Sequence, residues 1–403
     1  MHIIWEVAGW LLMLGWARKL APVWVSILWP RRLADVPPER GDDAALPGIS
    51  IIVPARDEAA AIEAALRRML ALDYPQLEVI AVNDRSTDAT GTIMDRVAAE
   101  DSRCRVVHVS ELPAGWLGKN HANALAAKQA RGEFLLFTDG DVLFEPDVLR
   151  RAMAFMRANG LDHLALLPDP MAETFGEQLL INYFTFQFTL LTNLPRVRDP
   201  AARDSFVGIG AFNLVRRSLY EAVGSHERLR MEVADDVLLG KLMKDAGGRQ
   251  DLLLGAPLVR VKWQKGFTGV IRGLEKNAFA GLRYSVAGVL LVTLISLAVN
   301  VLPPILIVTG PARWPAALFA ALAMTAHTAL ARVNGFNPLV GLLYPVAGVV
   351  MTYTLLRSMV LALWRGGIRW RDTFYPLAEL RAGMLEWRPL GGMLGSGRRS
   401  AGR

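Results

Sequence analysis

Three long apolar runs follow residue 284 and confine this chain to a membrane-associated fold. They extend from Val286 to Thr309, from Pro315 to Ala331 and from Leu339 to Leu363, with few charged residues inside them. A helix needs roughly 20 apolar residues to cross the hydrocarbon of a bilayer. The composition agrees with this, since 52% of the 403 residues are apolar and only 21% are charged. We therefore expect about three transmembrane helices between residues 285 and 365.

A fourth apolar segment covers residues 3–29 and is interrupted by Arg18 and Lys19. It lacks the basic start and the small-residue cleavage site of a signal peptide. We expect residues 1–33 to form an uncleaved membrane anchor, with an interfacial hairpin as the alternative.

The basic residues bear on partners and on topology. The chain has a formal net charge of +7, and much of its basic charge follows residue 364, beside apolar sequence. Because arginine near a membrane is attracted to anionic lipid, we expect residues 366–403 to be a juxtamembrane tail and expect no nucleic-acid partner. Arg31 and Arg32 favour a cytoplasmic position for the residues after them. One crossing before the central part and three after it would place the basic tail on the opposite side, against this tendency, unless one apolar segment does not cross.

Between the apolar segments, short strands alternate with helices. Residues 34–48, rich in proline and charge, are typical of a linker, and the alternation extends from residue 49 to about residue 265. This order predicts an α/β fold with a mainly parallel sheet, which binds ligands at the carboxyl ends of its strands. Residues 266–284 have apolar and basic residues at helical spacing, which favours an interfacial helix. The first four expected strands are ISIIVP, LEVIAVND, RVVHVS and EFLLFTD.

Carboxylates stand at the ends of three of these strands. Glu58 follows the first strand, Asp84 ends the second, and Asp139 and Asp141 follow the fourth, separated by one glycine. Buried carboxylates are costly unless something pairs with them. Oxygen ligands suit Mg²⁺ or Mn²⁺, which proteins often bind through one or two carboxylates together with substrate phosphates. We therefore interpret Asp139 and Asp141 as a divalent-metal site for a diphosphate.

Two further groups are candidates for the same site. Lys119 precedes an expected helix over residues 120–130, where the first backbone amides favour an anion such as phosphate. Asp235 and Asp236 stand at the start of another expected helix, whose dipole favours negative charge. Capping accounts for one of these two carboxylates, and the other could act as a general base on a hydroxyl.

In order and spacing, six motifs of the chain resemble those of the membrane-bound family 2 glycosyltransferases. The resemblance covers residues 49 to about 281 and the flanking membrane segments. It implies a GT-A fold and an inverting transfer of a sugar from a nucleotide donor. Among members of that family, the chain looks most like bacterial enzymes related to hopene-associated, carotenoid and ceramide-type lipid glycosyltransferases. The motifs are VPARDE, VNDRSTD, GWLGK, FTDGD, VADDVLLG and GLEKN.

The resemblance also implies roles for single residues. Asp139 and Asp141 would form the Asp-x-Asp motif, with Asp141 the expected direct metal ligand. Lys119 would contact the diphosphate, and Asp236, which follows Asp235, would be the catalytic base. Asp84 would read the uracil base. The nucleoside pocket would be lined by Pro54, Arg56, Glu58 and Asp84.

Three departures from the family pattern matter. Members commonly have Asn at the position of Asp57 and Asp at that of Asn83, so we assign no contact to either residue. Many have Glu-Asp at the start of the helix that carries the base, so the choice of base depends on position. Processive synthases carry Gln-x-x-Arg-Trp where this chain has GLEKN at residues 273–277. Lys276 could still contact the diphosphate, but the change argues against a polymerising synthase.

The function expected from the sequence is transfer of a sugar from a UDP-sugar to the hydroxyl of a membrane lipid, with Mg²⁺ or Mn²⁺ as cofactor. The protein would be a multi-pass component of the bacterial inner membrane, with its catalytic domain in the cytoplasm. A processive polysaccharide synthase and a catalytically inactive nucleotide-sugar-binding scaffold are the alternatives. The sequence names neither the sugar nor the lipid and carries no signal of oligomeric state.

Overall fold

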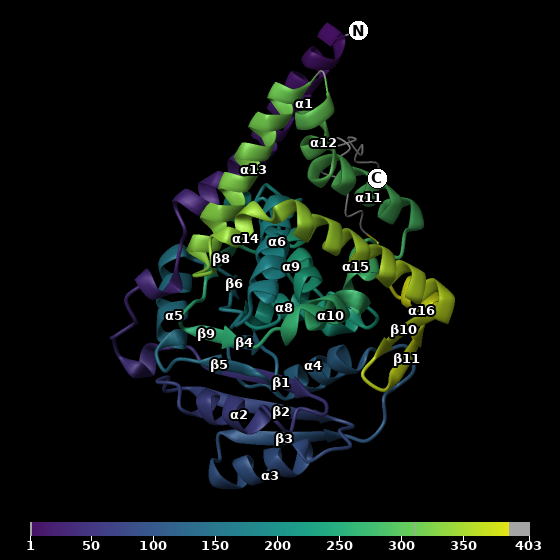
Figure 1. The fold of residues 1–403 in the computed structure, drawn as a ribbon. Helices are drawn as coiled ribbons and strands as arrows, with labels where there is room; N and C mark the ends of the chain where they lie inside the picture. The colour runs from purple at the N-terminus through teal and green to yellow at the C-terminus, as the bar shows by residue number, and fades with distance from the viewer. Residues whose placement is uncertain (1, 311, 387–403) are drawn as a thin grey trace, which may run out of the picture.

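The computed structural model describes residues 2–310 and 312–386, and its centre is a seven-stranded sheet (Figure 1). The strands lie in the order β3-β2-β1-β4-β7-β6-β8. Neighbours pair in parallel except at β7, which is antiparallel to both β4 and β6. The predicted mainly parallel α/β fold is therefore confirmed. The strands are β1 Ile49–Ala55, β2 Leu77–Asp84, β3 Cys104–Val109, β4 Phe134–Phe137, β6 His163–Leu167, β7 Asn213–Arg216 and β8 Gln250–Leu254.

Helices cover both faces of this sheet. Every residue of β1 is buried, and because side chains alternate between the two faces of a strand, each face needs its own cover. One face packs against α2, α3 and α5, and the other packs against α4, α8 and α9. The six helices are α2 Ile62–Leu70, α3 Thr90–Glu100, α4 Gly118–Gln129, α5 Val148–Asn159, α8 Arg217–Ala222 and α9 Asp235–Asp245. We call this layered part, residues 49–265, the sheet domain.

Two small antiparallel pairs lie outside the sheet. β5 (Val142–Phe144) pairs with β9 (Val259–Val261). β10 (Gly367–Trp370) pairs with β11 (Thr373–Pro376), and we call this pair the C-terminal hairpin. The sequence predicts a single juxtamembrane tail over residues 366–403, whereas the structure folds its first part into this hairpin and α16 (Leu377–Ala382). Residues 387–403 of the predicted tail lie outside the described residues.

Four helical segments of the described chain are long and apolar enough to cross a membrane. The first, in the region of the predicted anchor, is one continuous helix and not a hairpin. The other three coincide with the predicted apolar runs, and the first of these is divided into two helices at Val301. The helices are α1 His2–Leu28, α11 Val286–Asn300 with α12 Leu302–Thr309, α13 Arg313–Val333 and α15 Tyr344–Arg365.

Two helices join the sheet domain to these segments. α6 (Phe175–Thr192) begins with a capping box, in which the side chains of Thr174 and Glu177 each accept a hydrogen bond from the other residue's backbone. Phe186 of α6 packs among residues of α1 and α13. α10 (Gly266–Gly281) lies at the predicted interfacial helix and packs against α6 and α15. The short helices α7 and α14 span Leu194–Val197 and Leu339–Leu342.

Candidate active site

The predicted acids gather at the edge of the sheet where the parallel strands end. Asp84 is the last residue of β2, and Asp139 and Asp141 lie between β4 and β5. Asp235 and Asp236 are the first two residues of α9, at the helix end that favours negative charge. The strand-end pattern in the sequence therefore indicated a real cluster.

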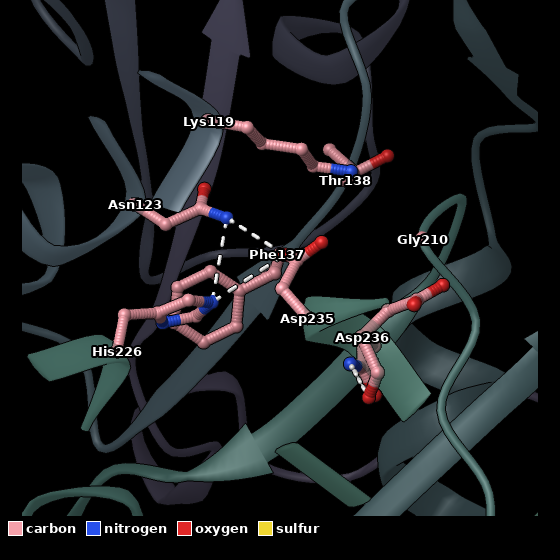
Figure 2. Close-up of a pocket in the computed structure, with 9 residues that line it drawn as sticks. Lys119, Asn123, Phe137, Thr138, Gly210, His226, Asp235 and Asp236 are labelled. Carbon is pink, nitrogen blue, oxygen red and sulfur yellow. Dashed lines mark hydrogen bonds and ion pairs between the residues drawn. The ribbon is translucent and has the colours of Figure 1, made fainter. Parts of the chain in front are cut away.

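Three charged groups, Asp139, Asp236 and Lys119, lie close to Gly210, which Figure 2 shows beside Asp236. A methyl group at this position would stand 3.1 Å from Oδ2 of Asp139, 3.3 Å from Oδ2 of Asp236 and 3.5 Å from Nζ of Lys119. These atoms come from three elements that are far apart in the sequence. Lys119, Gly210 and Asp236 line a small pocket together with Asp235, and Asp139 reaches it through its ion pair with Lys119.

Lys119 supplies the positive charge of this pocket. It is the second residue of α4, and its Nζ lies 2.6 Å from Oδ1 of Asp139. Burial alone would lower the pKa of Lys119, but Asp139, Asp235 and Asp236 together raise it. The lysine is therefore cationic at neutral pH, which is the state needed to bind a phosphate.

Asp139 and Asp141 are arranged as a two-carboxylate site. The residue between them must be small, because a methyl group on Gly140 would stand 3.1 Å from Cβ of Ala55 and 3.2 Å from Cδ1 of Ile62. The pKa of Asp141 is raised to about 7 by burial and by the nearby negative charges of Asp139 and Glu58. A cation bound here would relieve that cost.

The donor set fits Mg²⁺ or Mn²⁺ in the presence of a phosphate ligand. Within the described residues, no group of three His, Cys, Asp or Glu side chains is placed to hold a metal ion. Two carboxylates are nevertheless sufficient for these ions when substrate phosphates and water complete the coordination. The pair Asp139 and Asp141 is therefore suited to a metal that arrives with a diphosphate.

Asp235 is held by a buried polar network (Figure 2). Its Oδ2 lies 3.4 Å from Nδ2 of Asn123 and 3.7 Å from Nε2 of His226, and Nδ1 of His226 lies 2.9 Å from the hydroxyl of Tyr220. Burial would raise the pKa of Asp235, but Lys119 and His226 outweigh it and the pKa is lowered. Asp235 is thus a fixed anion.

Asp236 is arranged differently from its neighbour. Its Oδ1 accepts a hydrogen bond from the backbone amide of Val237 at 2.8 Å, while its Oδ2 faces the space beside Gly210. Burial and the charge of Asp235 raise its pKa to about 6. A carboxylate with a pKa near neutrality can both accept and release a proton at cellular pH. Of the two acids, Asp236 is therefore the better proton acceptor.

The predicted nucleoside-pocket residues lie beside this cluster. Pro54 is in β1, in register with Val82 of β2. Both carboxylate oxygens of Asp84 accept hydrogen bonds from Arg85, at 2.7 and 3.0 Å, so a base would have to join or replace this ion pair. A methyl group on Gly118 would stand only 2.2 Å from Oδ2 of Asp84, so the start of α4 packs directly on this carboxylate.

The C-terminal hairpin reaches the same pocket, which the sequence did not predict. Arg371 in its turn pairs with Glu58, and the guanidinium of Arg56 donates to the hydroxyl of Thr373 at 3.0 Å. The backbone amide of Gly118 donates to the hydroxyl of Tyr375 at 3.2 Å. The hairpin therefore contacts two of the predicted pocket residues directly.

Lys276 of α10 also meets the hairpin. Its Nζ lies 3.5 Å from the centre of the Trp370 ring, a cation–π contact. Burial and the charge of Lys119 lower the pKa of Lys276 to about 8. An anion between the two lysines would relieve their repulsion, as predicted for a diphosphate.

The sequence did carry a signal for the hairpin. The stretch GIRWRDTFYP alternates large apolar or aromatic residues with polar ones around Arg371, whose φ is +53°. Such alternation around a turn is typical of a β-hairpin. Its position after an apolar run, among arginines, instead favoured a lipid-facing tail. The partners Asn123, His226 and Gly210 had no comparable signal, because their roles depend on contacts distant in sequence.

Comparisons with known proteins show what the sheet domain is similar to. Residues 50–224 match the model of the glycosyl transferase family 2. The chain is 32% identical over 117 residues to the uncharacterized glycosyltransferase EpsJ of Bacillus subtilis, covering 29% of this chain and 33% of that protein. It is 30% identical over 126 residues to the beta-monoglucosyldiacylglycerol synthase of Synechocystis, covering 30% of this chain and 26% of that protein.

A solved structure extends the likeness to nearly the whole fold. The mannosyltransferase PcManGT from Pyrobaculum calidifontis, in complex with GDP-Man and Mn²⁺, superposes with a TM-score of 0.53 at 21% identity, over 91% of this chain and 99% of that chain. This likeness supports the predicted GT-A fold. The chain spans about a third of the length of EpsJ, and less of the lipid enzyme, so substrates must be argued from the site itself.

Proposed function

We propose that this chain, whose residues 50–224 match the glycosyl transferase family 2 model, is a metal-dependent inverting enzyme that transfers a sugar from a UDP-sugar to the hydroxyl of a membrane lipid. The observation that carries the proposal is the approach of Lys119, Asp139 and Asp236 to one point beside Gly210. A single displacement needs a cation at the leaving group, an anchor for the donor and a base at the acceptor. Side chains suited to each task border this one space.

In the proposed donor complex, Asp141 and Asp139 would hold Mg²⁺ or Mn²⁺ together with the diphosphate. The ion supplies positive charge that stabilises the departing diphosphate. Lys119 and Lys276 bind the same group from the protein side. Arg56, Glu58, Asp84 and Pro54 form the nucleoside pocket.

In the proposed transfer step, Oδ2 of Asp236 takes the proton of the acceptor hydroxyl. The acceptor oxygen bonds to the anomeric carbon as the bond from that carbon to the diphosphate breaks, so the configuration inverts and UDP leaves. The hydrogen bond from Val237 to Oδ1 orients the carboxylate. The fixed charge of Asp235 keeps the pKa of Asp236 high enough for proton transfer.

Two observations support a lipid as the acceptor. Lys276 of the proposed diphosphate site lies on α10, and α10 packs against α15, one of the long apolar helices. A hydroxyl at the membrane surface would therefore be close to the site. The name of the Synechocystis relative, a beta-monoglucosyldiacylglycerol synthase, agrees with such an acceptor. We place the sheet domain in the bacterial cytoplasm, where nucleotide sugars are made.

Asp236→Asn tests the proposed base. The amide keeps the size of the carboxylate and the hydrogen bond from Val237, but it cannot take a proton. We expect turnover to fall about 10²–10⁴-fold with UDP affinity unchanged, measured as UDP release by the detergent-purified protein and as UDP binding by calorimetry. Asp245→Asn, at the exposed end of the same helix, is the matched control and should be fully active. Normal turnover by Asp236→Asn would refute the base assignment.

The same assay identifies the substrates. A panel of UDP-sugars is supplied with total lipid extract and with either Mn²⁺ or EDTA. Release that needs both metal and lipid, with one or two sugars added per lipid, supports the proposal. Long sugar chains would indicate a processive synthase, and UDP binding without any turnover would indicate a scaffold.

A further inference from the structure

The segment that holds the three C-terminal apolar helices begins and ends against the sheet domain. Before it, the carbonyl of Tyr284 accepts a hydrogen bond from Arg381 of α16 at 2.9 Å. After it, Arg371 of the C-terminal hairpin pairs with Glu58. Because the hairpin and α16 follow each other directly, these contacts hold both ends of the segment on the side of the membrane where the sheet domain lies.

A segment that leaves one side of a membrane and returns to it crosses an even number of times. The three candidates, α11 with α12, α13 and α15, are each long enough to cross. At most two of them can do so. The conflict between three C-terminal crossings and the position of the basic tail is thereby resolved, and the question becomes which helix does not cross.

α13 runs beside α1 and in the same direction (Figure 1). Near their starts, a methyl group on Gly9 would stand 2.8 Å from Cγ of Pro315. At the other end, Arg32 donates to the carbonyl of Val333 at 3.4 Å. If α1 crosses toward the sheet domain, α13 therefore crosses in the same direction. The chain reaches the start of α13 through α11 and α12, which must then carry it outward.

α15, in contrast, has both of its ends on the sheet-domain side. Near its start, Ala347 packs in one cluster with Leu179 of α6 and Val270 of α10. At its end, Arg365 pairs with Glu275 of α10 at 2.9 Å. α15 therefore lies along α10, and in Figure 1 it runs across the direction of α1 and α13.

Charge and exposure along α15 agree with this position. Arg357, eight residues before the helix end, pairs with Glu275 at 3.1 Å on the side of α10. This ion pair is a further contact between α15 and α10, besides the packing of Ala347 and the ion pair of Arg365. The exposed apolar side chains recur at intervals of three, four and seven residues, which places them on one face of the helix. They are Val346, Val349, Tyr353, Val360 and Trp364, with exposures of 52, 47, 54, 56 and 80%, and Leu363 beside Trp364 is exposed to 43%.

We propose that α15 does not span the bilayer but lies in its sheet-domain half, with this exposed face against lipid. The described residues then cross three times, through α1, through α11 with α12, and through α13. The hairpin at the candidate site follows α15 after Gly366 alone. A lipid-contacting helix is thus joined directly to the C-terminal hairpin, which contacts Arg56 and Glu58 of the proposed donor pocket. This topology does not depend on the proposed reaction.

Single-cysteine labelling tests the topology. The native cysteine, Cys104, is buried and is replaced by alanine. In intact spheroplasts, a membrane-impermeant maleimide should label Thr309→Cys, at the end of α12. It should label Arg332→Cys, at the end of α13, and Ala378→Cys, in α16, only after permeabilisation. Ser102→Cys, exposed in the sheet domain, marks the inner side.

Each alternative outcome overturns the proposal. Labelling of Arg332→Cys from outside would mean that α15 crosses, and labelling of Ala378→Cys from outside would separate the tail from the sheet domain. Protection of Thr309→Cys and of its neighbour Arg313→Cys until permeabilisation would mean that α11 and α12 do not cross. Each variant is used only if it purifies as a monodisperse protein, and the neighbouring exposed position replaces one that does not.

Depth measurements on the exposed face give a second, independent test. Spin labels at Val346, Tyr353 and Val360 are compared in lipid vesicles by their collision with oxygen and with a water-soluble nickel chelate. A helix in one half of the bilayer gives equal depths or a steady trend along these positions. A spanning helix would give its greatest depth at Tyr353, with both other positions shallower, and that result would refute the proposal.

Discussion

Gly210→Ala is the sharpest test of whether the charged groups act on one substrate position. The added methyl would stand 3.1 Å from Oδ2 of Asp139 and 3.3 Å from Oδ2 of Asp236, closer than the ordinary contact range of 3.4–4 Å. Each carboxylate must then withdraw by a few tenths of an ångström, and the methyl fills space between them. Gly210 is not one of the glycines with a positive φ. Its backbone conformation is therefore open to alanine.

The expected size of the effect follows from the geometry. A misplacement of about 1 Å at a reacting centre costs on the order of 10²-fold in rate. In Gly210→Ala the carboxylates of Asp139 and Asp236 both move by less than about 1 Å, and the methyl fills space between them. Together these changes should lower kcat by about 10- to 100-fold. Gly210 is only half-buried, and substitutions outside the packed core usually change the free energy of unfolding by about 0.5 kcal/mol or less. The melting temperature should therefore stay close to that of the wild type.

Two other glycines serve as controls for the same substitution. A methyl on Gly281 at the end of α10 meets nothing within 4 Å, so Gly281→Ala should be active and stable. A methyl on Gly208 would stand 1.8 Å from the backbone carbonyl oxygen of Asp236, so Gly208→Ala should unfold or displace the start of α9. UDP release and thermal unfolding of the three variants are compared. Wild-type turnover by Gly210→Ala would refute the view that Asp139 and Asp236 border one reaction space.

Three further outcomes follow from the same site. Asp236 must be ionised to act as a base and its pKa is about 6, so kcat should fall as the pH is lowered through 6. Asp235→Asn removes the neighbouring charge and should move this fall in kcat to lower pH. A flat pH profile of kcat, or one that Asp235→Asn does not shift, would contradict this. Arg371→Ala removes the ion pair with Glu58. Because exposed pairs contribute up to about 1 kcal/mol, this variant should raise KM for the donor by up to about fivefold, and Arg371→Lys should rescue it in part. An unchanged KM would mean that the hairpin takes no part in donor binding. EDTA should abolish UDP release and Mn²⁺ should restore it, while Asp141→Asn should need far more Mn²⁺; activity that survives EDTA would exclude the metal.

Much of the sheet edge could be predicted from the sequence because the signals there are local. A buried strand shows as a short apolar run, and an acid directly after it shows as an interruption, as at Asp84 and Asp139. Parallel strands bring such ends to one edge of the sheet. The meeting of the strand-end acids follows from these two facts, and the α/β fold follows from the alternation of strands with helices.

The features that the sequence did not reveal depend on distant contacts. The exact role of Asp235 depends on His226 and Asn123, which lie on other elements and bring their side chains together only in the folded chain. The hairpin around Arg371 had a local signal, but its partner Glu58 is more than 300 residues away. The number of crossings likewise depends on where the chain returns, which no apolar run can indicate.

The contacts of the C-terminal hairpin have a practical consequence for anyone who expresses this protein. The folding unit that surrounds the candidate site is discontinuous, since Arg371 and Tyr375 touch residues near position 56 and position 118 from the far end of the chain. A fragment ending at residue 265 would retain every family motif up to the proposed base, Asp236. It would still lack Lys276 and the C-terminal hairpin that contacts the proposed donor pocket. Such a fragment should fold as a sheet domain with an open, weakened donor site, and its inactivity would say nothing about the intact enzyme. The removed strands, supplied as a separate peptide of residues 366–386 or joined directly after α10, would be the natural repair.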